Sequence, residues 1–195
     1  MNVLLVDNKS AHLVRLKQLI ESTFGVVTFR LHDPRDMAPT DVEWADLVVF
    51  SGGWGRSIVK NPQTFKRMVD LCVEHRKPTI GICLGAEAIA VYFGSRLSEL
   101  PVRRVGNVRM HFTDDFHGAA GLEPSVMVYE FHKWTIDTVQ PPLIALATSK
   151  DGPELFKHTD LPLWGMQFHP EVERLGNKGR AVFEYVASQL RLPKG

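Results

Sequence analysis

The stretch PTIGICLGAEAIAVYF occupies residues 78–93 and joins two apolar patterns without an intervening loop. Residues 78–82 predict a short buried strand, and residues 84–93 continue as a predicted helix. Cys83 stands at the junction with a glycine two residues away on each side. A strand that turns directly into a helix is the geometry of a nucleophile elbow, in which a strained backbone leaves a reactive side chain exposed, and glycines permit the strain. The helix N-terminus also favours a thiolate, so we expect the pKa of Cys83 to lie below its usual value of about 8.5.

The segments around this stretch predict the rest of the fold. Before it, strands are predicted at residues 2–6, 26–31 and 47–50, helices at residues 12–23 and 61–76, and a loop at residues 32–43. After it, shorter strands are predicted at residues 104–112, 125–131, 143–148, 154–157 and 163–168, and a last helix at residues 178–190. Alternating strands and helices are typical of a doubly wound sheet. The sequence therefore predicts a single α/β domain over residues 1–195, with a doubly wound, mostly parallel sheet, flanking helices and an added antiparallel portion.

Composition narrows the class of protein. The chain has 195 residues, 44% of them hydrophobic and 23% charged, which is enough to bury a continuous core. A formal net charge of +1 gives no global field for a nucleic acid or a membrane surface, and neither is expected as a partner. No apolar run approaches the roughly 20 residues needed to cross a bilayer. With two cysteines and no secretory pattern at the N-terminus, we expect a cytoplasmic protein with reduced thiols, and for Cys72 we favour a role in the core.

A cysteine nucleophile needs a base and a group that orients the base. The late apolar run at residues 163–168 ends in His169-Pro170-Glu171, which supplies an imidazole and a carboxylate two residues apart. The sequence therefore predicts a catalytic set of Cys83, His169 and Glu171, with His169 as the base and Glu171 as its orienting carboxylate.

The run at residues 47–50 ends in a pair of glycines whose backbone N–H groups are unobstructed by side chains. At the end of a parallel strand, Gly53 N–H can face a developing negative charge, and Leu84 N–H, one residue beyond the nucleophile, can supply the second donor. Gly53 and Leu84 are therefore the predicted oxyanion hole. A phosphate-binding loop at residues 52–55 is the less favoured alternative, because no Lys-Ser or Lys-Thr follows and the glycine spacing is not that of a dinucleotide site.

Three blocks together, at residues 51–53, 81–85 and 165–171, resemble the signature blocks of class I glutamine amidotransferases, in that family's order and spacing. The resemblance covers essentially the whole chain, and in size the chain is similar to free-standing glutaminase subunits such as the small subunit of GMP synthetase. It implies a flavodoxin-like fold, hydrolysis of L-glutamine without a cofactor or metal, and ammonia passed to a synthetase partner. It also implies that substrate-binding residues include four positions near the blocks: Gly52, Gly85, Glu87 and His132.

Some positions depart from the family pattern and leave alternatives open. Glu87 stands where the family usually has glutamine, one helical turn after the nucleophile, and an ionised carboxylate accepts hydrogen bonds but donates none. Phe131, Trp134 and Trp54 also replace residues that are common in the family. A γ-glutamyl hydrolase acting on another amide, and a catalytically idle regulatory subunit of a synthetase, therefore remain alternatives.

Two structural alternatives accompany these functional interpretations. His132 has a structural hydrogen-bonding role as its simpler interpretation. A zinc site made of Cys83, His132, His169 and Glu171 is disfavoured, because no pair has the close spacing of structural zinc motifs.

Overall fold

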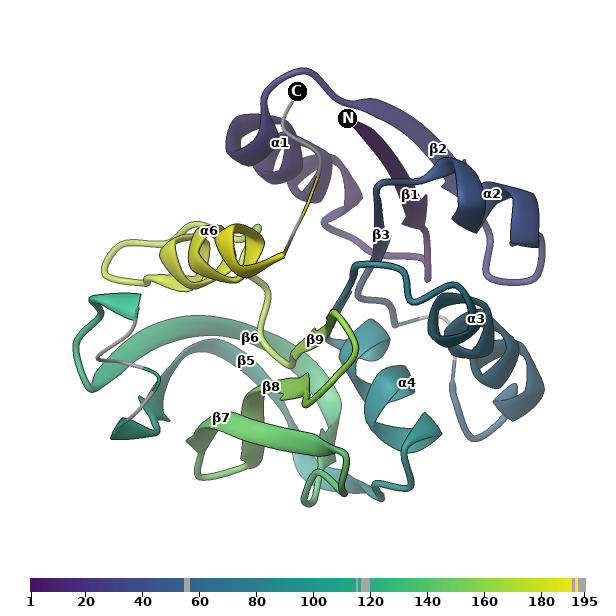
Figure 1. Cartoon of the computed structure of the whole chain (residues 1–195). Coiled ribbons are helices and arrows are strands. Elements are labelled where there is room, and N and C mark those ends of the chain that lie inside the picture. Colours follow the sequence, from purple (N-terminus) through teal and green to yellow (C-terminus); the bar gives the residue numbers. More distant parts are fainter. Residues whose placement is uncertain (55–56, 115, 117–119, 191, 193–195) are drawn as a thin grey trace.

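A computed structural model describes residues 1–54, 57–114, 116, 120–190 and 192. Its centre is one nine-stranded sheet in the order β2-β1-β3-β4-β9-β8-β7-β5-β6 (Figure 1). The strands are β1 (Asn2–Val6), β2 (Thr28–His32), β3 (Leu47–Phe50), β4 (Thr79–Ile82), β5 (Leu97–Phe112), β6 (Ser125–Ile136), β7 (Leu143–Ser149), β8 (Gly152–His158) and β9 (Leu163–Met166). The first five strands in this order pair in parallel, and the other four continue the sheet in antiparallel fashion.

Helices cover both faces of the parallel half. On one face lie α1 (Leu13–Phe24) and α6 (Gly179–Gln189), and on the other lie α2 (Pro39–Trp44), α3 (Pro62–Glu74) and α4 (Leu84–Tyr92) (Figure 1). Alternate strand residues face the two layers, because successive side chains of a strand point to opposite faces. Val49 of β3 packs toward α1 and α6, whereas its neighbour Phe50 packs toward α3 and α4. This confirms the predicted α/β fold with a doubly wound, parallel core, in which β2-β1-β3-β4 has the flavodoxin-like order.

The predicted helices agree with the structure to within about two residues, and the main error concerns residues 32–43. They were predicted as one loop, but His32 belongs to β2 and residues 39–44 form the short helix α2. Pro39 takes the first helical position, where its missing N–H costs nothing, and the Asp41 side chain accepts the Ala38 N–H. A proline that opens a helix was thus misinterpreted as a loop signal.

The antiparallel half differs from the prediction mainly in length. β5 and β6 form a long curved hairpin that pairs from Leu97 with Ile136 to His111 with Ser125, and a register shift lies between Glu99 and Arg104 (Figure 1). The prediction of residues 104–112 recovered only the part of β5 beyond this shift. Exposed valines and arginines in the hairpin carry no clear alternation, so the first half of β5 had no strand signal in the sequence.

Candidate active site

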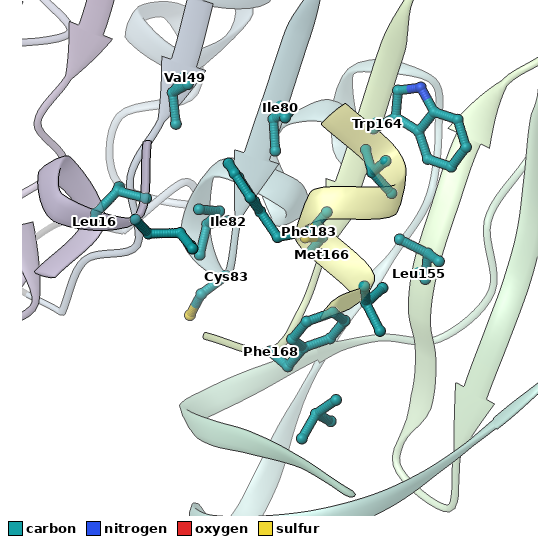
Figure 2. Packing of buried hydrophobic residues seen from close by; sticks show 14 of the residues in the cluster. Leu16, Val49, Ile80, Ile82, Cys83, Leu155, Trp164, Met166, Phe168 and Phe183 are labelled. Atoms are coloured by element: carbon teal, nitrogen blue, oxygen red, sulfur yellow. The ribbon is translucent and has the colours of Figure 1, made fainter. Parts of the chain in front are cut away.

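Cys83 lies at the end of β4 and immediately before α4. Its φ of 48° and ψ of −108° place a residue with a side chain in a strained region of the backbone map. The Cys83 N–H donates to Met166 O at 2.7 Å, which ties the turn to the neighbouring strand β9. Figure 2 shows Cys83 beside Ile82 within the cluster of buried residues that β4, β9 and α6 share. The strain and the position are those of a nucleophile elbow.

The two flanking glycines allow close approach rather than unusual dihedral angles. Cys83 itself has the positive φ, and neither Gly81 nor Gly85 is among the glycines with positive φ. A Cβ on Gly81 would lie 2.6 Å from the carbonyl carbon of Gly85, and a Cβ on Gly85 would lie 2.5 Å from Phe50 O. The helix can therefore start directly against the sheet only because these side chains are absent. The glycines thus permit the elbow by leaving room for it, and the strained dihedral angles are those of Cys83 itself.

His169 and Glu171 follow β9 and are held beside the elbow. The His169 N–H donates to Tyr129 O of β6 at 2.8 Å, and His169 Nδ1 lies 2.8 Å from Glu171 Oε1. Both side chains are buried, and His169 Nε2 makes no hydrogen bond to a described residue. Because Glu171 accepts the Nδ1 proton, the neutral imidazole keeps the lone pair of Nε2 available as a base. The structure thus brings together the three residues that the sequence predicts as a catalytic set.

The buried setting changes the proton equilibria of this set. Burial raises the pKa of Cys83, although the positive charge of His169 and the Leu84 N–H both oppose this. The expected lowering of that pKa by the helix N-terminus is therefore wrong, because desolvation of the thiolate outweighs the helix end. Burial also disfavours the His169 cation, but Glu171 and the Cys83 sulfur outweigh it, so the pKa of His169 is raised well above 6.5. Because the charge on the Cys83 sulfur is one cause of this rise, the coupling favours transfer of the thiol proton to His169, which gives a thiolate beside an imidazolium.

The glycine pair after β3 fits tightly between neighbouring groups. A Cβ on Gly52 would lie 2.7 Å from His169 Cε1 and 3.4 Å from Cys83 Cβ, so any side chain there would intrude between them. A Cβ on Gly53 would lie 2.0 Å from Asn8 O. The turn is fixed by Asn8, whose N–H donates to Ser51 Oγ at 2.9 Å and whose Nδ2 donates to Ser51 O at 2.7 Å.

A cavity of about 190 Å³ opens beside the elbow. It is lined by Gly53, Trp54, Ser57, Cys83, Leu84, Glu87, Arg103, Phe131, His132, Lys133 and Trp134. The lining includes both predicted oxyanion donors, and it includes Glu87 and His132 of the four predicted substrate-binding residues. Gly52 and Gly85 are not part of it: Gly52 lies against both His169 and Cys83, and Gly85 packs on β3.

Comparison with known proteins identifies the family. Residues 4–187 match the family model described as Glutamine amidotransferase class-I, which covers nearly the whole chain. The chain belongs to this family. It is 31% identical over 179 residues to the aminodeoxychorismate synthase of Streptomyces griseus, but the match spans only 24% of that protein. It is 28% identical over 176 residues to a glutamine-hydrolysing GMP synthase subunit of Pyrococcus abyssi, and this match covers 87% of the chain and 89% of the relative.

A solved structure supports the fold of this class I glutamine amidotransferase. The crystal structure of a Thermoplasma acidophilum protein, described as a subunit of GMP synthase, superposes with a TM-score of 0.81. It shares 24% sequence identity, and the match covers 96% of this chain and 92% of that one. At this identity the likeness establishes the fold.

Glu87 is the main departure from the amidotransferase pattern, and it is buried at the cavity. Only 4% of its surface is exposed, and Gln167 Nε2 donates to its Oε1 at 3.1 Å. Burial raises its pKa from 4.5 to about 7, although the hydrogen bond from Gln167 and the charges of His132 and His169 act in the opposite direction. At neutral pH this carboxyl group is therefore protonated in a large fraction of molecules. In that form it can donate a hydrogen bond, as the usual glutamine amide can.

His132 is the end of a buried chain of titratable groups. Its Nδ1 lies 2.7 Å from Trp134 O, so Nδ1 carries a proton, and its Nε2 lies 3.0 Å from Glu130 Oε2. Glu130 interacts in turn with Glu154, and each of these carboxyl groups has one buried oxygen without a donor among the described residues, Glu130 Oε1 and Glu154 Oε2. Burial and the Glu130 charge raise the pKa of Glu154 well above 4.5.

Two residues after β1 contribute to the site and were not predicted from sequence. Asn8 fixes the Gly52-Gly53 turn, and His12 packs its ring edge-on against His169 with 5.3 Å between ring centroids. Both follow the carboxyl end of a parallel strand, where sites of doubly wound sheets form. The signal in the sequence that could have indicated these site residues was the run of polar residues directly after the strand at residues 2–6.

Three further results bear on the other expectations. Among the described residues, no group of three or more His, Cys, Asp or Glu side chains is arranged to hold a metal ion. Within the same residues, no helix has the length and apolarity to cross a bilayer. Cys72 and Cys83 are both free and buried, and burial raises the pKa of Cys72 to about 12.

Proposed function

We propose that this amidotransferase hydrolyses L-glutamine to L-glutamate and ammonia through a thioester on Cys83, with His169 and Glu171 completing the catalytic triad. The observation that carries the proposal is the strained Cys83 elbow, which stands beside the buried His169–Glu171 pair, 2.8 Å apart, and opens on a cavity of about 190 Å³. A purely structural cysteine needs neither the strain nor the buried base.

In the first half of the reaction, His169 Nε2 takes the proton of the Cys83 thiol, and the sulfur attacks the side-chain amide carbon of glutamine. The carbonyl oxygen becomes an oxyanion that accepts hydrogen bonds from the Gly53 and Leu84 N–H groups. The C–N bond then breaks, and the imidazolium of His169 returns its proton to the leaving nitrogen. Ammonia and a glutamyl thioester on Cys83 are the products.

In the second half, water attacks the thioester carbon while His169 Nε2 accepts one of its protons. The C–S bond breaks, the sulfur regains a proton from His169, and glutamate leaves. Glu171 holds the imidazole in one orientation throughout and stabilises its cation. No cofactor is needed, since each step is a proton transfer or an acyl transfer.

We propose further that the ammonia passes to a separate synthetase chain. The Pyrococcus abyssi relative is named as one subunit of GMP synthase, and its match with the chain covers 89% of its length. The chain therefore corresponds to the glutaminase part of such an enzyme rather than to its ammonia-consuming part. GMP synthetase is the first synthetase to test as the partner.

The experiment is to incubate the purified chain with L-glutamine, with and without a candidate synthetase partner, and to measure glutamate and ammonia. Cys83→Ala is the inactive variant, and Cys72→Ala is its matched control, because Cys72 is buried away from the cavity. Activity that persists in Cys83→Ala would refute the mechanism. If the wild type releases neither glutamate nor ammonia, with or without the partner, the chain would be better interpreted as an idle regulatory subunit.

Glu87 supports a second candidate function, the hydrolysis of another γ-glutamyl amide. Its carboxyl group lines the cavity and is about half ionised near neutral pH, so it can receive an amino group as well as an amide. A panel of γ-glutamyl amines should be compared with L-glutamine for the wild type and for Glu87→Gln. This candidate requires that the wild type prefer a γ-glutamyl amine and that Glu87→Gln shift the preference to glutamine.

A further inference from the structure

The proposed reaction needs a water molecule at His169 in its second half, and the structure contains a separate small cavity at that side chain. The cavity holds about 10 Å³ and is lined by Ser10, Ala11, His12, Gly53, Trp54, Phe131 and His169. This volume is close to the space that a single water molecule requires. Gly53, Trp54 and Phe131 also line the larger cavity that contains Cys83, so the two spaces adjoin.

Residues able to hydrogen-bond a water molecule are part of the lining of the small cavity. They are Ser10, His12 and His169. His169 is 97% buried, since 3% of its surface is exposed, and its Nε2 has no hydrogen-bond partner among the described residues. A buried nitrogen without a partner is costly, and a water molecule in this cavity would remove that cost.

The ring of His12 is held in place by three ring neighbours. Its ring packs edge-on against His169, Tyr129 and Phe131, with centroid distances of 5.3, 6.3 and 6.2 Å. Burial and the neighbouring charge of His169 lower its pKa below 6.5. A neutral imidazole has one donor and one acceptor nitrogen, so it can orient a water molecule without competing with His169 for the proton.

From this geometry we propose that His12 is a positioning residue for thioester hydrolysis, holding the attacking water against His169. The water oxygen forms the new bond to the thioester carbon, one water proton passes to His169 Nε2, and the Cys83 sulfur leaves. His12 exchanges no proton in this step. It acts on the second half of the reaction and leaves the attack of Cys83 on the amide unaffected. The inference rests on the proposed thioester mechanism.

The test separates the two halves of the reaction. His12→Phe keeps an aromatic ring among the same neighbours but removes the ring nitrogens. His12→Gln instead keeps a polar group at this position. His111→Phe is the matched control, because it makes the same exchange at an exposed site on β5. The enzyme is mixed with L-glutamine, quenched in acid, and the glutamyl adduct on Cys83 is measured by mass spectrometry. Parallel reactions contain hydroxylamine, which attacks the thioester without needing an oriented water molecule and yields γ-glutamyl hydroxamate.

For His12→Phe we expect turnover to fall about tenfold, the loss that accompanies one ordinary hydrogen bond in the transition state. The thioester should accumulate, hydroxylamine should restore turnover, and His12→Gln should recover part of the hydrolysis. Slow turnover without thioester accumulation, or without rescue by hydroxylamine, would overturn the inference, because His12 would then only support the shape of the site. Unchanged turnover would overturn it too. Glutamine hydrolysis that persists in Cys83→Ala would overturn the thioester mechanism itself, and the inference with it.

Discussion

Replacing Glu87 by glutamine tests the most unusual feature of the site through the pH dependence of stability. Burial raises the pKa of Glu87 from 4.5 to about 7, so the folded protein holds this proton more tightly than the unfolded chain does. Stability is therefore lost as the pH rises from 4.5 through 7, and at 1.36 kcal/mol per pH unit the loss reaches about 3 kcal/mol. Glutamine has nearly the same shape and no ionisation, and it can still accept the Gln167 hydrogen bond. Glu87→Gln should therefore be more stable than the wild type above pH 7.

The assay is urea unfolding of both proteins at several pH values between 4 and 9, followed by tryptophan fluorescence. The difference in the free energy of unfolding should be small near pH 4, should grow between pH 4.5 and 7, and should level off near about 3 kcal/mol at pH 8.5. Glu43→Gln, on the exposed surface of α2, is the matched control and should show no such trend. A difference that stays constant over the whole pH range would refute the reasoning, because Glu87 would then ionise in the folded protein as it does in the unfolded chain.

Three further predictions address the geometry of the site. Gly52→Ala should lower kcat about 100-fold or more while circular dichroism stays native, because the added Cβ would lie 2.7 Å from His169 Cε1 and displace the imidazole. Native turnover would show that His169 can move aside without loss of function. Glu171→Gln should leave the fold unchanged and reduce glutamine hydrolysis about 100-fold to 10,000-fold, because a neutral amide cannot stabilise the His169 cation. A loss of less than tenfold in steady-state assays would argue against the triad. Glu154→Gln should stabilise the protein increasingly as the pH rises above 4.5, because the folded state holds the proton of this carboxyl group more tightly than the unfolded chain does. A urea series in which the stabilisation shrinks with rising pH would contradict the raised pKa.

Much of the fold follows from patterns that are local in the sequence. The apolar periods of β1, β3, α1 and α3 predict their types because period and burial are properties of neighbouring residues. The same holds for the Cys83 elbow, in which the strand and the helix are adjacent in the chain, and for His169 and Glu171, which are two residues apart. Where local signals conflicted, as with the proline that opens α2, the prediction failed.

The sequence by itself thus determined the doubly wound parallel core and the identity of the three residues at the elbow and after β9. Only the tertiary structure decided their proton equilibria, because the desolvation that raises the pKa of Cys83 depends on everything packed around it. It also decided that Gly52 lies against His169 and Cys83 and that His12 lies against His169. The raised pKa of Glu154 likewise depends on Glu130, which belongs to another strand. Close approach and burial are long-range properties, and no local pattern of residues contains them.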